Sequence, residues 1–342
     1  MSQKSTIGRT FAMSSLRAAF AAANAISPEL AAAGATRLFL STRRRPVPAR
    51  EQAFLQGARR VDFESELGTL AVWVWGEEGR PTVALLHGWE GRASQLGAFA
   101  PPLVAAGFRV VGIDAPGHGD SPGSNSTLVA MGEALLALGE RFGPFAGVIA
   151  HSAGSPAAIH ALRRGLVTGR LVCVAPGVDL VGFSREFARL FGLSDAVRQG
   201  LQRRIERKVG VSWNDLDPRR APADVRVPLL VIHDRDDREA PFAGGEELAR
   251  AWGARLLATE GLGHTRILWN EAVVAAATEF LREGRAGQPS ELASRARLPR
   301  QRRSAASAQA AGQTRSESLI FSGSAVTPSV SLSLPMRGDP TR

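Results

Sequence analysis

Short apolar segments alternate with amphipathic helical segments from about Arg60 to Arg282, and this alternation limits the fold more than any other feature of the chain. An antiparallel pair and six further strands are predicted, at Val61–Glu64, Thr69–Trp75, Thr82–Leu86, Arg109–Ile113, Gly147–Ala150, Leu171–Val174, Pro228–His233 and Arg255–Thr259. Parallel strands that are buried on both faces form continuous apolar runs. The pattern therefore predicts an α/β fold whose mostly parallel, twisted sheet carries helices on both faces.

One interval lacks an apolar strand and is expected to form a separate part. Residues 177–225 hold two helical patterns, around Phe183–Phe191 and Ser194–Val209, between two predicted strands. We expect a small helical cap inserted over the carboxyl edge of the sheet, where it would roof a pocket. The α/β core is then predicted to consist of residues 51–176 and 226–283.

The two ends of the chain carry its positive charge. The net charge is +10, with net +7 in residues 1–50, net +6 in residues 284–342, and a small acidic excess between them. A nucleic-acid enzyme is expected to carry its basic residues on a folded face, so this distribution argues against nucleic-acid binding. Residues 1–50 are predicted to form a helical extension on the outside of the core, with attachment to a membrane surface as the alternative. The Arg- and Ser-rich segment 284–342 is predicted to be a disordered basic tail.

The cysteine content and the hydropathy of the chain indicate a cellular compartment. Cys173 is the single cysteine, so an internal disulfide is impossible, which suits a reducing compartment. No apolar run reaches the roughly 18 residues that span a bilayer, which predicts no integral membrane span. The Ala-rich stretch Met13–Ala35 is interrupted by Arg17 and Pro28 and is not expected to be a signal peptide. We therefore expect a cytoplasmic protein.

The strongest chemical signal is a serine between a predicted strand and a predicted helix. The sequence Ala-His-Ser-Ala-Gly, residues 150–154, places small residues two positions before and two positions after Ser152. A sharp strand-to-helix turn needs small residues there and exposes the serine hydroxyl. Ser152 is thus the predicted nucleophile; the alternative is a purely structural turn.

A second turn follows the predicted strand Thr82–Leu86. Its sequence His87-Gly88-Trp89 could supply a backbone N–H to an oxyanion that develops on an attacked carbonyl. The residue after the nucleophile could supply the other. We assign these donors to Trp89 and Ala153, although a glycine turn without a chemical role is the simpler alternative.

Candidate acid and base residues follow later strands. The loop 234–241 contains Asp234, Asp236 and Asp237, and Asp237 is the preferred acid that orients the base. Asp234 and Asp236 remain alternatives, as does Asp179 from an earlier loop. His264 lies in a glycine-flanked loop after the last predicted strand, and a neutral imidazole there could accept the serine proton. The order serine, acid, histidine supports this assignment.

Together these motifs resemble the α/β-hydrolase superfamily over roughly residues 60–283. The matching segments are His87-Gly88-Trp89, the run from Asp114 to Ser121, His151-Ser152-Ala153-Gly154, the loop 234–241 and Gly263-His264. The resemblance implies the α/β-hydrolase fold, a catalytic triad of Ser152, Asp237 and His264, and an oxyanion hole of Trp89 and Ala153. Two departures are Ala150, where glycine is usual, and Asp234, where glycine is common.

The resemblance implies a serine hydrolase that cleaves a small ester, thioester or amide through an acyl-enzyme. The predicted pocket contains His87, Gly88 and His151, with an apolar wall that includes Phe183 and Phe187 of the cap. A catalytically silent binding protein, an acyltransferase and a haloperoxidase-like enzyme are the alternatives. No cofactor and no metal are expected, the partner is a small acyl substrate, and the sequence leaves the oligomeric state and substrate open.

Overall fold

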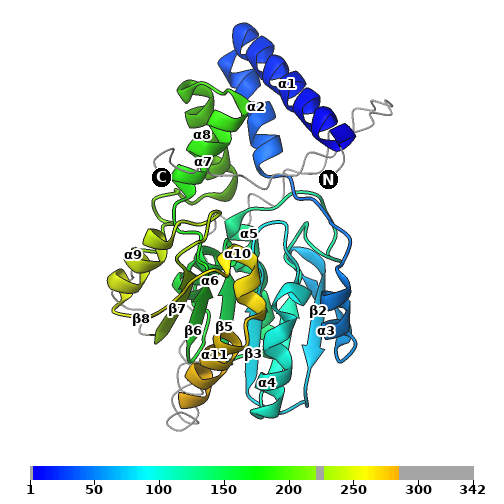
Figure 1. Cartoon of the computed structure of the whole chain (residues 1–342), viewed down its shortest axis with the longest axis vertical. Helices are drawn as coiled ribbons and strands as arrows, with labels where there is room; N and C mark the ends of the chain where they lie inside the picture. The colour runs from blue at the N-terminus through cyan, green and yellow to red at the C-terminus, as the bar shows by residue number, and fades with distance from the viewer. Residues whose placement is uncertain (1–2, 221–226, 285–342) are drawn as a thin grey trace. The chain divides into compact units, whose positions relative to one another are not determined.

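The computed structural model describes residues 3–220 and 227–284, which form two compact units. In the larger unit, an eight-stranded sheet has the order β1-β2-β4-β3-β5-β6-β7-β8 (Figure 1). β2 pairs antiparallel with both β1 and β4, and every other neighbouring pair is parallel. The strands are β1 (Arg59–Ser65), β2 (Gly68–Trp75), β3 (Thr82–Leu86), β4 (Arg109–Ile113), β5 (Phe145–His151), β6 (Leu171–Val174), β7 (Leu229–Asp234) and β8 (Arg255–Thr259).

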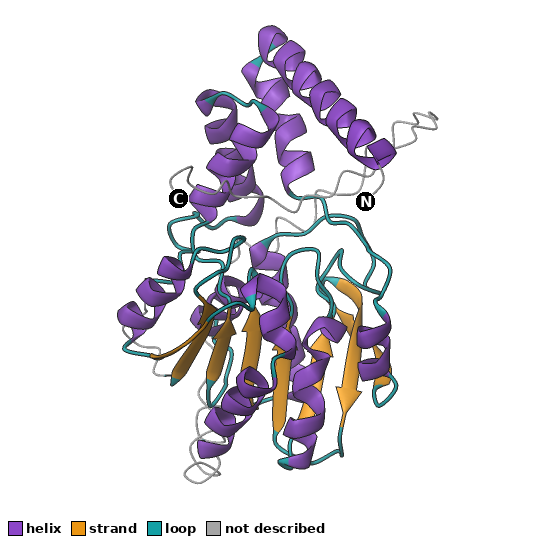
Figure 2. Cartoon of the chain, viewed as in Figure 1, coloured by secondary structure: helices purple, strands orange, loops and turns teal. Residues whose placement is uncertain are grey.

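Helices cover both faces of this sheet, and each face has its own apolar core (Figure 2). Side chains of α5 (Leu128–Phe142), α6 (Gly154–Arg163) and α9 (Phe242–Trp252) pack in one core. The other core contains side chains of η1 (Ala93–Phe99), α4 (Ala100–Ala105), η2 (Ile267–Trp269) and α11 (Glu271–Glu283). The central strands β3 and β4 have buried residues throughout, as their continuous apolar sequences require. The predicted α/β fold is confirmed.

Some elements differ from the prediction. The single helix expected from Ser94 to Ala106 is a 3₁₀ segment, η1, followed by the short helix α4. Pro101 and Pro102 explain the break, because a residue without a backbone N–H fits only the first turn of a helix. Two short helices were not predicted, α3 (Ala49–Leu55) and α10 (Gly263–Arg266). The predicted tail, residues 284–342, lies outside the described residues apart from Gly284, as does part of the predicted cap.

The smaller unit is helical and combines the N-terminal segment with residues 181–213. Its helices are α1 (Gln3–Ile26), α2 (Pro28–Phe39), α7 (Leu180–Phe191) and α8 (Asp195–Val209). The backbones of α2 and α8 approach closely, since a Cβ added at Gly200 would lie 2.8 Å from the Cβ of Ala32. Phe39 provides the main aromatic contact, with its ring against those of Phe183, Phe187 and Trp213. Helices predicted as an extension and as a cap thus share one packed unit.

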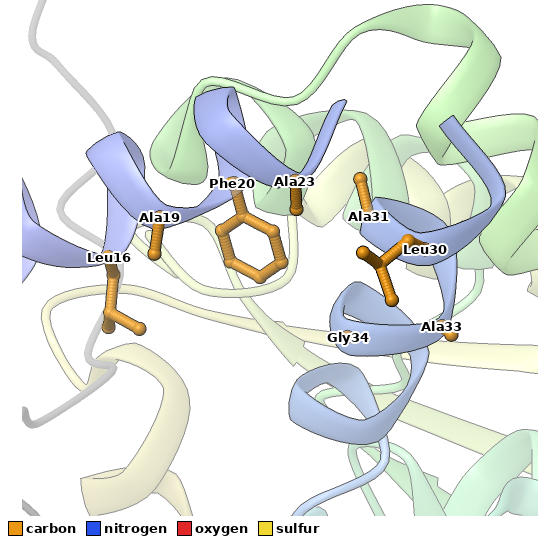
Figure 3. Close-up of a pocket in the computed structure, with 8 residues that line it drawn as sticks. All are labelled: Leu16, Ala19, Phe20, Ala23, Leu30, Ala31, Ala33 and Gly34. Carbon is orange, nitrogen blue, oxygen red and sulfur yellow. The ribbon is translucent and has the colours of Figure 1, made fainter. Parts of the chain in front are cut away.

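An apolar hollow of about 310 Å³ lies between α1 and α2. Phe20 and Leu30 point toward it from the two helices, and Leu16, Gly34 and several alanines complete its wall (Figure 3). Among the helices described, none combines the length and the apolar character needed to cross a bilayer.

Candidate active site

Ser152 lies at the turn between β5 and α6, in a backbone conformation that non-glycine residues seldom adopt. Its φ is 51°, in the left-handed region. The N–H of Ser152 donates to the carbonyl of Val174, and its own carbonyl accepts from the N–H groups of Ser155 and Gly177. These bonds hold the turn in its strained form, and the serine side chain remains partly exposed.

Gly154, two residues after Ser152, must be small because two backbone segments approach each other closely there. A Cβ added at Gly154 would lie 2.5 Å from the carbonyl oxygen of His87 and 2.7 Å from that of Leu86. Ala150, on the other side of the serine, is fully buried in β5. The packing of β5 and α6 against the end of β3 therefore explains the size limit seen in the sequence.

Ser152, His264 and Asp237 form a continuous hydrogen-bonded chain. The Ser152 Oγ lies 2.9 Å from His264 Nε2, and His264 Nδ1 lies 2.7 Å from Asp237 Oδ2. Residues from the ends of β5 and β7 and from α10, after β8, thus meet at the carboxyl edge of the sheet, where ligands bind in open α/β sheets. The imidazole is nearly buried, and the Asp237 side chain has no exposed surface.

Asp237 is held as a carboxylate despite its burial. Its Oδ1 accepts from the backbone N–H groups of Glu239, at 2.8 Å, and Ala240, at 2.9 Å. Burial alone would raise the pKa of this carboxyl, but hydrogen bonds from His233, His264 and the backbone hold it well below its usual range. Asp237 is therefore ionised at neutral pH and acts only as a hydrogen-bond acceptor.

The neighbouring carboxylates shape the loop that carries His264. Asp234 accepts hydrogen bonds from the hydroxyl of Thr259, at 2.7 Å, and from the N–H of Leu262, at 3.0 Å. Asp236 accepts from the N–H of Gly261 at 2.9 Å. Of the three aspartates in the acid loop, Asp237 is the one that contacts the His264 ring, and the other two order the turn before it.

The loop after β3 lies directly against Ser152. A Cβ added at Gly88 would be 2.8 Å from the Cβ of Ser152. Within the described residues, the N–H groups of Trp89 and Ala153 donate no hydrogen bond to the protein. Both are therefore free to donate to a ligand, as the predicted oxyanion hole requires.

Two buried histidines support the loops around the serine. His87 accepts from the N–H of Ala115 at 3.0 Å through Nε2 and donates through Nδ1 to the carbonyl of Gly88 at 2.7 Å. His151 Nε2 donates to the backbone carbonyl of His264 at 3.1 Å. Burial lowers the pKa of His87 well below its usual value and that of His151 to about 3, so both rings are neutral supports at neutral pH.

The residues predicted to line a pocket divide between the two units. His87, Gly88 and His151 lie around Ser152 in the α/β unit. Phe187 contacts Phe39 and Phe191 within the helical unit, and Phe183 is 46% exposed. The role of these two phenylalanines stays a prediction.

Sequence reasoning missed His233, at the end of β7. Its Nε2 lies 3.2 Å from Asp237 Oδ2 and 3.0 Å from the carbonyl oxygen of Ala240. The available signal was a histidine four residues before the candidate acid, at the end of a buried strand.

A model of the alpha/beta hydrolase family matches residues 83–277, more than half of the chain. The chain belongs to the alpha/beta hydrolase family. The matched region of this hydrolase includes Ser152, Asp237 and His264, and the resemblance inferred from the sequence motifs is confirmed.

This hydrolase is similar to several esterases and lipases. It is 29% identical over 236 residues to a pimeloyl-[acyl-carrier protein] methyl ester esterase of Aromatoleum aromaticum, covering 55% of this chain and 93% of the relative. Among solved structures, a putative lipase from Acinetobacter baumannii matches with a TM-score of 0.54 and 18% identity, over 71% of this chain and 99% of the lipase. A thermophilic esterase from Thermogutta terrifontis matches with a TM-score of 0.53 and 17% identity, over 70% of this chain and 97% of the esterase. The structural likenesses establish the fold, and the family match with the esterase relative supports an enzyme of the carboxylic ester hydrolase type.

Proposed function

We propose that this chain is a serine hydrolase that cleaves a small carboxylic ester, with thioesters and amides as related substrates, through an acyl-enzyme intermediate. One observation carries the proposal: the hydroxyl, imidazole and carboxylate of Ser152, His264 and Asp237 lie in hydrogen-bonding order, at 2.9 Å and 2.7 Å. The named esterase relative favours an ester as the substrate class.

In the proposed reaction, His264 Nε2 accepts the proton of Ser152 as the Oγ attacks the ester carbonyl. Asp237 accepts a hydrogen bond from the Nδ1–H of His264, so the ring proton stays on Nδ1 and Nε2 is free to act as the base. The imidazolium then gives its proton to the leaving alkoxide, which departs as an alcohol. Water attacks the acyl-enzyme with the same imidazole as base, which releases the carboxylic acid and restores the serine.

We propose that the N–H groups of Trp89 and Ala153 donate to the oxyanion that forms on the attacked carbonyl. Two free backbone donors next to Ser152, one in the loop after β3 and one directly after the serine, suit this role, because their positions are fixed before the reaction begins. Removal of one such donor in another serine hydrolase costs on the order of 10²–10³ in rate.

The proposed substrate carries an apolar acyl group. The proposal rests on Trp89, whose ring stands edge-on to that of His118 and whose loop lies against Ser152. We also propose that the enzyme works in the cytoplasm, a compartment that suits its single cysteine.

A fluorophosphonate probe and a panel of esters of graded acyl length test the proposal. We expect the wild-type protein to be labelled and to hydrolyse part of the panel, and Ser152→Ala to lose labelling and turnover, by a factor on the order of 10⁶ in kcat. Ser155→Ala is the matched control, because the Ser155 hydroxyl donates to the carbonyl of Ala150 inside the fold and should leave both signals unchanged. A folded wild-type protein that is neither labelled nor active would overturn the proposal.

A further inference from the structure

The Asp237 carboxylate makes one side-chain contact that the proposed reaction does not use. Its Oδ2 lies between two imidazoles, 2.7 Å from Nδ1 of His264 and 3.2 Å from Nε2 of His233. Neither Asp237 nor His233 has an exposed side-chain atom. The second imidazole therefore meets the carboxylate in an environment without bulk water, where such a contact is strong.

The hydrogen-bond partners of His233 identify its tautomer. Nε2 faces Asp237 Oδ2 and the carbonyl oxygen of Ala240, and both of these atoms can only accept, so Nε2 must carry the proton. Nδ1 is buried and has no hydrogen-bond partner among the described residues. His233 thus donates from one nitrogen only, toward the acid and the turn beside it.

The ring of His233 cannot easily change its orientation. A Cβ added at Gly245, on α9, would lie 2.3 Å from Nδ1, so the helix backbone packs directly against this edge of the ring. The ring of Phe242 meets it edge-to-face, with centroids 5.7 Å apart. Helix α9 and strand β7 therefore fix the direction of the Nε2–H group.

We propose that His233 is a positioning residue, whose Nε2–H holds Asp237 Oδ2 in line with Nδ1 of His264. The proposal rests on the proposed function, because a positioned acid matters only if His264 acts as the base. With Oδ1 held by two backbone N–H groups and Oδ2 held by His233, the carboxylate keeps one orientation toward His264 throughout the reaction. A purely structural role, in which His233 only secures the Ala240 carbonyl, is the competing account.

Two substitutions of His233 separate these accounts. His233→Phe keeps the ring volume and removes the donor, whereas His233→Gln keeps an N–H donor on a flexible side chain. We expect His233→Phe to lower kcat by about tenfold with KM unchanged, and His233→Gln to recover most of this loss. The same two substitutions at His160, a buried histidine on α6 that lies near Glu133, are the matched controls and should change kcat by less than about twofold.

A second measurement does not depend on turnover, and its first part needs no variant. In the wild-type protein with ¹⁵N-labelled histidine, NMR should show His233 protonated at Nε2 and bare at Nδ1. The downfield proton of His264 Nδ1, assigned by its loss in Asp237→Asn, should shift in His233→Phe and return toward its wild-type position in His233→Gln.

The outcomes distinguish this inference from the proposed function. An Nδ1–H tautomer of His233, or a His264 proton and a kcat that His233→Phe leaves unchanged, would overturn the positioning role. If the wild-type protein hydrolyses no ester, yet His233 shows the expected tautomer and the His264 proton shifts as expected, the proposed function would be refuted. The positioning of Asp237 by His233 would then still be supported.

Discussion

Replacing Asp237 by asparagine should invert the hydrogen bonding around His264 without removing a heavy atom. The Oδ1 position accepts two backbone N–H groups, from Glu239 and Ala240, so the amide oxygen of the asparagine must occupy it. The amide nitrogen then takes the place of Oδ2 and directs an N–H group at His264 Nδ1. Because Nδ1 must now accept, the ring proton moves to Nε2, and the base can no longer receive the proton of Ser152.

The expected loss is large because the wrong tautomer disables the base. The equivalent change in a well-studied serine protease lowers kcat about 10⁴-fold, which corresponds to about 5.5 kcal/mol in the activation free energy. We expect a similar loss for Asp237→Asn, with KM changed by less than about threefold. The assay is steady-state hydrolysis of the best ester of the panel, with circular dichroism to confirm that the variant is folded.

Asp236→Asn is the matched control. Asp236 is exposed, and its carboxylate accepts only from the N–H of Gly261 among the described contacts, so its loss should change kcat by less than about threefold. The reasoning would be refuted if Asp237→Asn kept more than about a tenth of the wild-type kcat. It would also be refuted if Asp236→Asn were equally damaging, since the acid would then not be specific to Asp237.

Three further predictions concern stability and are measured by urea unfolding. Gly154→Ala should lower the free energy of unfolding by about 1–3 kcal/mol, because its Cβ would meet two backbone carbonyls. For the control Gly57→Ala, whose nearest contact would be at 3.9 Å, the free energy of unfolding should fall by less than about 0.5 kcal/mol. Burial raises the pKa of Asp114 from 3.8 to about 6, so the folded state binds more protons than the unfolded state between these values. The free energy of unfolding of the wild type should therefore fall by about 2 kcal/mol relative to Asp114→Asn from about pH 4 to about pH 7; a constant difference would contradict this. Phe39→Ala should destabilise the helical unit by roughly 2–4 kcal/mol, and a loss below about 0.5 kcal/mol would show that its three ring contacts add little.

The sheet was predictable because its signal is local. Each central strand is a short apolar run, and burial on both faces dictates that pattern whatever the rest of the chain does. The break at Pro101 and Pro102 was visible in the sequence, but an amphipathic pattern continues across it, and periodicity alone does not distinguish one helix from two.

The contacts around the site were harder to predict, because they join residues far apart in the chain. The guanidinium of Arg44, for example, donates to the carbonyls of Gly119, Ser121 and Gly123, more than seventy residues later. The choice among Asp234, Asp236 and Asp237 depends on where each carboxylate points after the loop has folded. Side-chain direction in such a loop is set by long-range hydrogen bonds, such as that from Thr259 to Asp234, which the local sequence does not encode.

The strained backbone of Ser152 is hydrogen-bonded to a second turn, after the neighbouring strand β6, that also contains a strained residue. Ala175, which follows β6, also has a positive φ, 46°, and non-glycine residues in this region cost on the order of 1 kcal/mol each. The two turns are joined by hydrogen bonds in both directions, from the N–H of Ser152 to Val174 and from the N–H of Gly177 to Ser152. Neither turn can relax to an ordinary strand conformation without breaking a bond to the other. The direction of the Ser152 hydroxyl is therefore a property of the paired ends of β5 and β6, and the proposed nucleophile is held toward His264 before any substrate binds.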